Sequence, residues 1–416
     1  MILSQIAWID CFAFLLFLAP QLLLHVNTID LAICAFKAIP HLRMPPPKSP
    51  SLNSHNPLTF PIPVLVLPYH LTHERYLTPR VHRSAFVQHA TLFQDLVIRC
   101  VRYAFTSIPA SIGAVFFSPP VALPFLRFRM LRHGYLRSPI YWRAINRKGL
   151  QGLFMIHDET RRPDIVVYYC HGGGFSMGSS YFYMEFLFAW VSLLKDAGYA
   201  NPALFALEYT LVPTATYPTQ LQEALAGYKY CLSIAEDPSR ICVSGDSAGA
   251  TLILSLLLCL SNYAGGMRDK LPGLAIPISP WAVILNPNHR NTASDYLDKD
   301  SLHLYGSQYI GTKANLDDPL VSPGSCKDLA WWRRASPTLG WFFVYGAEEV
   351  FAPDARELVA VLKKGGIPVE VLEEKGWIHA WPVVKLFLCN GQEERQSGLR
   401  AMVNFMRERL EPGKDI

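Results

Sequence analysis

The chain has 416 residues, of which 50% are hydrophobic and 17% are charged, and its formal net charge is +5. Such an apolar composition indicates contact with lipid or a large apolar cap, and the modest, scattered positive charge gives no support to nucleic-acid binding. The nine cysteines include no C-x-x-C pair, so neither a disulfide framework nor a zinc site is indicated.

The amino-terminal stretch, residues 2–26, is almost wholly apolar and long enough to cross a hydrocarbon core of about 30 Å. Asp10, which is costly in lipid, and Pro20, which would kink a helix, leave open a segment that lies in the membrane interface. No Lys or Arg precedes the stretch, whereas Lys37 follows it, which disfavours a secretory signal peptide. We expect residues 1–43 to be a single-pass membrane anchor, in the endoplasmic reticulum, with the remainder on the cytoplasmic face.

Two further segments precede the expected core. Residues 44–82 are expected to form a linker, because the prolines between 44 and 68 prevent a continuous helix. Residues 83–135 permit helices that are interrupted by prolines. Two interpretations of this second segment stay open together, namely a helical cap over the functional site and a second membrane-associated segment.

From residue 136 to 412 the sequence alternates strand-like apolar runs with helix-length segments. This alternation predicts a mostly parallel sheet with helices on both faces, which is an α/β fold. The expected strands are 165–170, 203–207, 241–244, 274–278, 341–345 and 369–372, and the expected helices include 182–197, 218–235 and 354–364.

The strand at 241–244 leads into Gly245-Asp246-Ser247-Ala248-Gly249, and an apolar run of helix length follows directly. This strand, turn and helix are the context that a nucleophile elbow requires. The flanking glycines leave room for a turn so tight that a side chain two residues from the serine would collide with the neighbouring strand or helix. The sequence therefore predicts that Ser247 is a nucleophile held over the end of the sheet.

A glycine loop, His171-Gly172-Gly173-Gly174, follows the strand at 165–170. Three consecutive glycines let backbone N–H groups turn toward a developing oxyanion, where a Cβ would obstruct the approach. Such a loop accompanies the serine elbow in lipases and esterases. We expect the N–H groups of Gly172, Gly173, Gly174 and Ala248 to form an oxyanion hole.

With both motifs in this order, and each after a strand, the chain resembles the hormone-sensitive-lipase family of α/β-hydrolases. In layout it is most similar to fungal membrane-anchored sterol-acetate hydrolases. The resemblance implies an α/β-hydrolase fold with a cap ahead of the first core strand. The segment 208–218 is similar to a Tyr-Arg-Leu-Ala-Pro segment of the family, but Thr210 and Thr214 replace its Arg and Glu. Any ion pair that those residues make in relatives is therefore absent here.

A serine nucleophile needs a base to take its proton and an acid to orient the base, and α/β-hydrolases supply them in the order serine, acid, histidine. Beyond residue 300 the chain has only His303 and His379. His379 follows the expected strand at 369–372, where the loop with the base belongs, whereas His303 lies in an expected helix. We therefore predict that His379 is the base.

The acid is expected just after the strand at 341–345. The family's pattern there, carried over onto this sequence, points to Glu349 in place of the commoner aspartate, and its longer side chain can still accept from the imidazole Nδ1–H. Glu348 and Asp354 remain alternatives. Asp354 also suits the first turn of the following helix, where a carboxylate interacts favourably with the helix dipole.

These roles predict a serine carboxylic-ester hydrolase that works through an acyl-enzyme and requires neither a metal nor an organic cofactor. The resemblance implies a small, acetyl-like acyl group on an apolar alcohol such as a sterol or a secondary metabolite. The expected partners are this small-molecule ester and a membrane, with no nucleic acid. Two alternatives stay open: an acyltransferase with the same triad, and a catalytically silent, membrane-tethered binder of a lipophilic ligand. The sequence leaves the oligomeric state undetermined.

Overall fold

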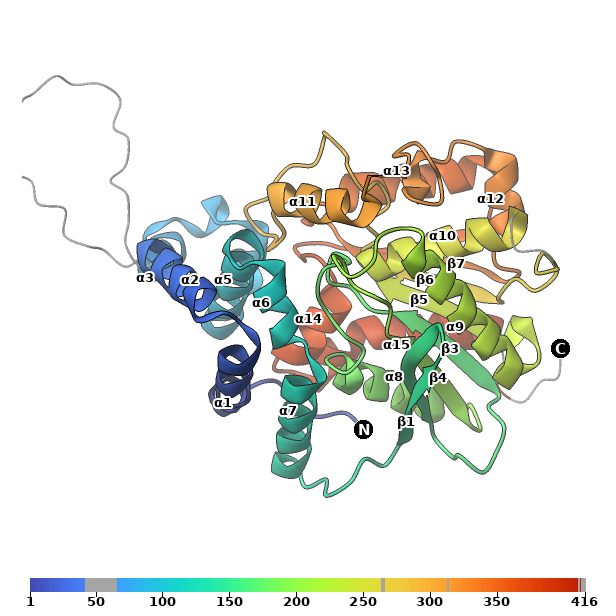
Figure 1. The fold of residues 1–416 in the computed structure, drawn as a ribbon, viewed down its shortest axis with the longest axis horizontal. Coiled ribbons are helices and arrows are strands. Elements are labelled where there is room, and N and C mark those ends of the chain that lie inside the picture. Colours follow the sequence, from blue (N-terminus) through green and yellow to red (C-terminus); the bar gives the residue numbers. More distant parts are fainter. Residues whose placement is uncertain (42–65, 263–265, 313, 411, 413–416) are drawn as a thin grey trace, which may run out of the picture.

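The structure, a computed structural model, describes residues 1–41, 66–262, 266–312, 314–410 and 412. An eight-stranded sheet runs through the larger part of the molecule, with helices on both of its faces, and a group of further helices covers one end (Figure 1). The expected α/β architecture with a mostly parallel sheet is confirmed.

The sheet has the strand order β1-β2-β4-β3-β5-β6-β7-β8. The strands are β1 (Tyr141–Arg147), β2 (Leu150–Ile156), β3 (Ile165–Cys170), β4 (Pro202–Leu207), β5 (Ile241–Asp246), β6 (Leu274–Ile278), β7 (Gly340–Gly346) and β8 (Val369–Glu374). Strands β3 to β8 run parallel, whereas β2 pairs antiparallel with both β1 and β4. Every residue of β3 to β7 is buried, which explains their near-continuous apolar sequences, since helices cover both faces of a parallel sheet.

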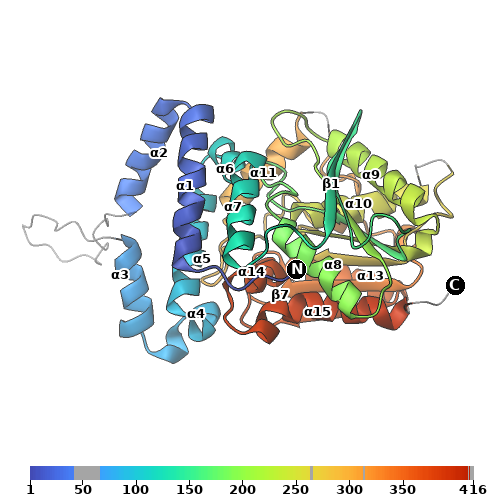
Figure 2. The same cartoon turned by 90° about the horizontal axis from the view of Figure 1, so that it is seen from below.

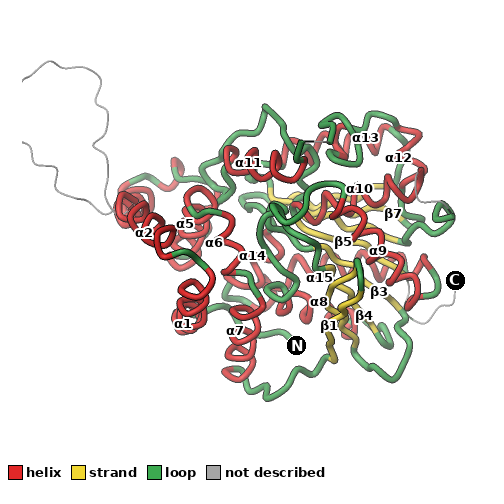
Figure 3. The backbone as a smooth tube through the Cα atoms, in the orientation of Figure 1, coloured by secondary structure: helices red, strands yellow, loops and turns green. Residues whose placement is uncertain are grey.

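The helices of the core form two layers (Figure 3). Helices α9 (Thr219–Ala235), α10 (Ala248–Asn262) and α13 (Ala352–Lys364) contact one face of the sheet, and α12 (Leu329–Ala335) packs on α10. Helices α8 (Met184–Asp196) and α15 (Gln392–Arg409) contact the other face, with α14 (Trp381–Leu388) against α15. Each face carries its own buried apolar cluster. The loops that follow the strands therefore lie between two apolar clusters, one on each face of the sheet.

The amino-terminal part folds as helices at one end of the sheet (left in Figures 1 and 2). They are α1 (Trp8–His25), α2 (Thr28–His41), α3 (Val66–Thr72), the π-helix η1 (His73–Leu77), the 3₁₀ helix η2 (Arg80–His82), α4 (Ala85–His89), α5 (Leu92–Ser107), α6 (Ala110–Phe116) and α7 (Pro119–Arg132). Helix α11 (Lys299–Ile310) and the short η3 (Pro238–Arg240) and η4 (Pro323–Ser325) complete the fold.

Part of the expected linker is helical, which corrects the sequence-based expectation. Glu74 in η1 pairs with Arg99 of α5 at 2.6 Å and accepts a hydrogen bond from Ser84, so the segment is attached to the cap helices. Residues 42–65, which include the expected boundary between anchor and linker, lie outside the described residues. The three expected boundaries between the four segments stay predictions.

Three of the prolines in the predicted cap segment lie within α7, and Pro109 precedes α6 as its N-cap. Pro119 and Pro120 occupy the first turn of α7, where a missing N–H costs no intrahelical hydrogen bond. Pro124 lies inside the same helix. The interruptions that the prolines predict are two breaks, at Ile108 and Pro109 between α5 and α6 and at Phe117 and Ser118 between α6 and α7.

Candidate active site

Three predicted site residues lie at one edge of the sheet. Ser247 directly follows β5, Glu349 follows β7, and His379 lies in the loop after β8. Since these strands are parallel, their carboxyl ends share one edge. All three side chains are buried. Residues that are separated by more than 100 positions are thus brought to the same end of the fold.

The turn at Ser247 has the tight geometry that the two glycines predict. Ser247 has a φ of +54°, a conformation that non-glycine residues adopt at an energetic cost. A Cβ on Gly249 would lie 2.0 Å from the carbonyl oxygen of Cys170, and one on Gly245 would lie 2.6 Å from it. The Ser247 N–H donates to the carbonyl of Ile278 at 3.0 Å, which fixes the turn against β6.

Glu349 is the predicted acid that meets His379. Its Oε2 lies 3.6 Å from Nδ1 of His379, which is longer than a hydrogen bond and within ion-pair distance. Burial raises the pKa of Glu349. Burial alone would lower the pKa of His379, but the carboxylates of Glu349, Asp295 and Asp246 together outweigh burial and raise that pKa above its ordinary value. These carboxylates therefore stabilise the protonated imidazole.

Asp354, the alternative acid, is engaged elsewhere. One oxygen lies 2.8 Å from Nε2 of His289, and the other accepts from the Asn286 amide at 2.6 Å. It lies in the first turn of α13, as its alternative interpretation expected. The third candidate, Glu348, is half-buried in the same loop, where its carbonyl accepts from Thr292.

The glycine loop presents backbone N–H groups beside the serine turn. Gly173 and Gly174 have φ values of +112° and +61°, and a Cβ on Gly173 would lie 2.1 Å from the Met177 carbonyl oxygen. Among the described residues, none accepts a hydrogen bond from either N–H. Ala248 is the first residue of α10, so its N–H has no acceptor within the helix. These three donors are available to a ligand.

Gly172 was expected to be an oxyanion donor, but the structure does not leave its N–H free. Its N–H donates to Oδ1 of Asp246 at 2.8 Å, so it is occupied within the protein. A Cβ at this position would lie 2.3 Å from the other Asp246 oxygen, which explains the glycine as a requirement for close approach. The Asp246 carboxylate also accepts from the hydroxyls of Tyr169 and Tyr183, at 2.6 and 2.7 Å. Asp246 thereby joins the serine turn to the glycine loop.

His171 packs against the same loop inside the protein. Its ring is buried and stacks on Tyr209 with a centroid distance of 4.3 Å, and its Nδ1 lies 2.7 Å from the Gly172 carbonyl oxygen. Burial lowers the pKa of His171 to about 4. The imidazole is therefore neutral at physiological pH and acts as a packing group.

Two polar residues that the sequence did not identify connect the acid loop to the histidine loop. The buried Asp295 carboxylate accepts from the N–H of His379 at 3.1 Å and from the N–H of Val350 at 2.8 Å. Ser279 donates to Glu349 Oε2 at 2.6 Å and accepts from the Ala380 N–H at 2.9 Å. Ser279 stands in a Ser-Pro-Trp loop typical of the resembled family, whereas no motif marks Asp295.

The two threonine replacements alter how the loop after β4 is held. Thr210 donates its N–H and its hydroxyl to the Glu223 carboxylate, at 2.8 and 2.6 Å. These two hydrogen bonds attach the loop to α9 without an ion pair. Thr214 lies in a turn, where its N–H donates to the Leu211 carbonyl.

Cap helices contact the loops that carry the site. Phe105 of α5 packs on Tyr296 with a centroid distance of 5.5 Å, and Tyr296 packs on His379 at 5.8 Å. On the other side, Ser179, in the segment after the glycine loop, donates to the Phe117 carbonyl at 2.5 Å. Helices of the segment 83–135 therefore contact residues that pack on the site, and its role as a cap stays a prediction.

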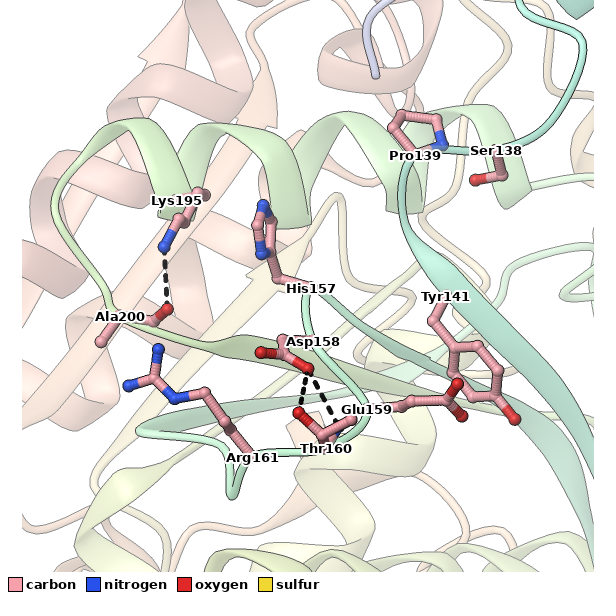
Figure 4. Close-up of a pocket in the computed structure, with 10 residues that line it drawn as sticks. All are labelled: Ser138, Pro139, Tyr141, His157, Asp158, Glu159, Thr160, Arg161, Lys195 and Ala200. Carbon is pink, nitrogen blue, oxygen red and sulfur yellow. Dashed lines mark hydrogen bonds between the residues drawn. The ribbon is translucent and has the colours of Figure 1, made fainter.

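A surface hollow of about 600 Å³ lies away from these residues (Figure 4). It is lined by residues such as Asp158, Arg161 and Ala200, which precede β3 and β4 and so lie at the amino ends of the parallel strands. Its polar groups pair with one another, as Asp158 does with Thr160. The hollow is at the opposite edge of the sheet from Ser247.

Comparisons with known proteins give a consistent picture. Residues 167–383 match the family described as alpha/beta hydrolase fold. An acetyl-hydrolase of Streptomyces hygroscopicus is 33% identical over 227 residues, which cover 53% of this chain and 70% of that protein. A protein of Schizosaccharomyces pombe that is provisionally named a steryl acetyl hydrolase is 26% identical over 231 residues, 52% of this chain and 59% of its own length.

Among solved structures, an esterase from the bacterial hormone-sensitive lipase family is similar, with a TM-score of 0.60 and 22% identity. The match covers 77% of this chain and 99% of the esterase. At this identity the likeness shows the fold alone.

Proposed function

Because this chain belongs to the α/β-hydrolase family and is a carboxylic ester hydrolase of the hormone-sensitive-lipase type, we propose that Ser247, His379 and Glu349 form its catalytic triad. One observation carries this proposal. A serine with a φ of +54°, a buried imidazole and a buried carboxylate occupy loops after three parallel strands, in the chain order of α/β-hydrolases.

The mechanism follows from these groups. His379 takes the proton from the Ser247 hydroxyl as its oxygen attacks the ester carbonyl. The N–H groups of Gly173, Gly174 and Ala248 donate to the oxyanion that forms. The imidazolium, stabilised by Glu349, then gives its proton to the leaving alcohol as the carbon–oxygen bond breaks.

The second half of the reaction releases the acid. Water loses a proton to His379 and attacks the acyl-enzyme carbonyl, and the proton returns to the serine oxygen as the acyl group leaves. No step of this cycle needs a metal or an organic cofactor.

For the substrate, we favour a small, acetyl-like acyl group on an apolar alcohol such as a sterol or a secondary metabolite. The names of the two relatives support the acyl group, since one is an acetyl-hydrolase and the other is provisionally a steryl acetyl hydrolase. The aromatic side chain of Phe105, which reaches the site through Tyr296, supports an apolar alcohol.

We further propose that the amino-terminal segment attaches the enzyme to a membrane, such as that of the endoplasmic reticulum. Within the described residues, Trp8–His25 and Ala110–Arg132 have the length and hydropathy of a membrane span. The sequence favoured a single-pass anchor at the first of these, with attachment in the membrane interface as its alternative.

The experiment combines a fluorophosphonate label with p-nitrophenyl esters of increasing acyl length on the purified full-length protein. We expect Ser247 to be labelled, and turnover to be fastest with acetate and to decline with longer acyl groups. Ser247→Ala should lose both labelling and turnover while remaining folded. The matched variant Ser233→Ala, which removes a hydroxyl on α9, should keep both.

Several results would contradict the proposal. Turnover that persists in Ser247→Ala would place the chemistry elsewhere. A wild-type protein without labelling or turnover would favour the binder. Product analysis with an added alcohol separates hydrolysis from acyl transfer, because a transferase forms the new ester in preference to the free acid.

A further inference from the structure

Helix α1 is part of the folded cap. It packs along α7 and also contacts α6, and Figure 2 shows it between α2 and α7. Phe14 of α1 packs on Phe125 of α7 with a centroid distance of 5.2 Å, and Trp8 packs on Phe93 of α5 at 5.0 Å. One side of the helix, with the buried Asp10, Ala13 and Leu18, therefore faces protein.

A buried ionic network locks α1 to the enzyme. Asp10 is the only acidic or basic residue of α1 apart from His25, and it is fully buried. Its carboxylate pairs with Arg129 at 3.0 Å and with Arg132 at 2.7 Å, and Arg129 also pairs with Glu185 of α8 at 2.7 Å. Moving α1 alone into the bilayer would separate Asp10 from both arginines and place its carboxylate unpaired in hydrocarbon, which is costly.

The residues before α1 are inserted into the catalytic core. Met1 and Leu3 are buried in the apolar cluster that includes α8 and α15. The Ile6 N–H donates to the Phe387 carbonyl of α14 at 2.8 Å. The amino end of α1 is therefore fixed to the body of the enzyme.

The outward side of α1 is apolar and uncovered. Exposed large apolar residues recur at helical spacing, with side chains that are 55–74% exposed: Trp8, Ile9, Phe12, Leu15, Leu16, Leu23 and Leu24. Ile29 and Ile33 of the following helix α2 are also exposed. A continuous exposed apolar surface marks a site of contact with a partner or a membrane.

The chemistry of this surface favours lipid over protein. The exposed stripe contains no charged side chain, whereas a protein docking site normally has a polar rim. A tryptophan at the beginning of such a helix is typical of the interface between acyl chains and headgroups. A helix that crosses the bilayer would instead need to face lipid on all sides, and the inward side of α1 carries Asp10 and protein contacts.

The second apolar stretch, residues 110–132, is also packed within the protein. Phe117, between α6 and α7, accepts a hydrogen bond from Ser179 and packs on Phe182 with a centroid distance of 4.7 Å. Arg129 of α7 is fully buried. Residues 110–132 thus connect α1 to the segment that follows the glycine loop.

We infer that α1 lies in the plane of the membrane interface, with Trp8 to Leu24 against the acyl chains, and does not cross the bilayer. This inference rests on the proposed membrane attachment. In this arrangement the cap lies on the lipid surface. Helices α6 and α7 are then between the bilayer and the loops of the site. An apolar ester dissolved in the membrane would then reach the enzyme at its cap.

The first test asks whether the two ends of α1 lie on the same side. Full-length variants Ser4→Cys and Thr28→Cys are produced in cells, and sealed microsomes are treated with a membrane-impermeant maleimide before and after detergent. Peptide mapping distinguishes the new cysteine from the native ones. Both positions should respond alike, whereas protection of one and labelling of the other in sealed microsomes would show a span and overturn the inference.

The second test removes the apolar stripe. Phe12→Asp/Leu16→Asp/Leu23→Asp should lose flotation with phosphatidylcholine vesicles and keep hydrolysis of p-nitrophenyl acetate, which reports that the core is folded. The matched variant Leu136→Asp/Leu304→Asp, at exposed apolar residues elsewhere, should float as wild type does. Equal flotation of both variants would overturn the inference.

The two proposals fail in different ways. An active wild-type protein that neither floats nor pellets with membranes would refute the membrane attachment itself. A microsomal protein with its two labelled positions on opposite sides would refute only the in-plane arrangement.

Discussion

Replacing Glu349 with glutamine removes a negative charge next to His379 while keeping the size of the side chain. At 3.6 Å and an effective dielectric constant near 20, a full charge pair is worth about 4.6 kcal/mol. Each 1.36 kcal/mol corresponds to a factor of ten, so the loss is about three decades in kcat. The defect of about four decades for the same change in a chymotrypsin-like triad is of comparable size.

The assay compares kcat and KM for p-nitrophenyl acetate in Glu349→Gln and Asp354→Asn. The second variant makes the same chemical change in a buried carboxylate of the same segment, but that carboxylate contacts His289 and Asn286. We expect Asp354→Asn to lower the melting temperature and to leave kcat within about tenfold of wild type, since removing a charged partner from a buried hydrogen bond costs about 1–3 kcal/mol.

The reverse ranking would refute this reasoning. If Asp354→Asn lost more kcat than Glu349→Gln, the acid would be Asp354 and the observed contact between Glu349 and His379 would be incidental. Equal and small losses in both would exclude either carboxylate as the orienting group.

The remaining predictions concern pH and packing. Only the neutral His379 imidazole can act as a base, and its raised pKa means that it becomes protonated at a higher pH than a free imidazole. The value of kcat/KM for p-nitrophenyl acetate should therefore fall on acidification with a midpoint above pH 6.5. A midpoint below pH 6.5 would contradict the Glu349 contact. The depressed pKa of His171 contributes stability above pH 6.5 that is lost as pH falls to about 4, about 3 kcal/mol in all by linkage. Urea unfolding at pH 7, 5 and 4 measures this loss of stability. The variant His171→Gln should lose less stability between pH 7 and pH 4 than the wild type does. Gly249→Ala should abolish folding, because its Cβ would lie 2.0 Å from a carbonyl oxygen, whereas Gly391→Ala, with no atom nearer than 3.9 Å, should fold and remain active. Asp295→Asn should lower kcat with little change in KM, because it loosens the backbone N–H of His379 and not the ester; an unchanged kcat would remove its positioning role.

The α/β architecture and the local form of the serine turn and glycine loop could be predicted from the sequence. Both depend on short-range physics. Parallel strands that are buried on both faces have continuous apolar sequences, and a turn without space for a Cβ requires glycine on both sides of Ser247. Six of the eight strands, and the identity of the only two histidines beyond residue 300, could be predicted from the sequence, whereas β1 and β2 were not.

Which polar groups meet in the site depends on contacts between residues that are far apart in the chain. Glu349, Glu348 and Asp354 stand within six positions, so the choice of the carboxylate next to His379 depends on how the loops after β7 and β8 are held, by Asp295 and Ser279. Likewise, the sequence favoured a spanning helix and kept an interfacial segment as the alternative, because Asp10 is costly in lipid. Its partner Arg129 lies 119 positions away. A buried charge is acceptable once a distant residue pairs with it, and a pattern of neighbouring residues cannot express such a pairing.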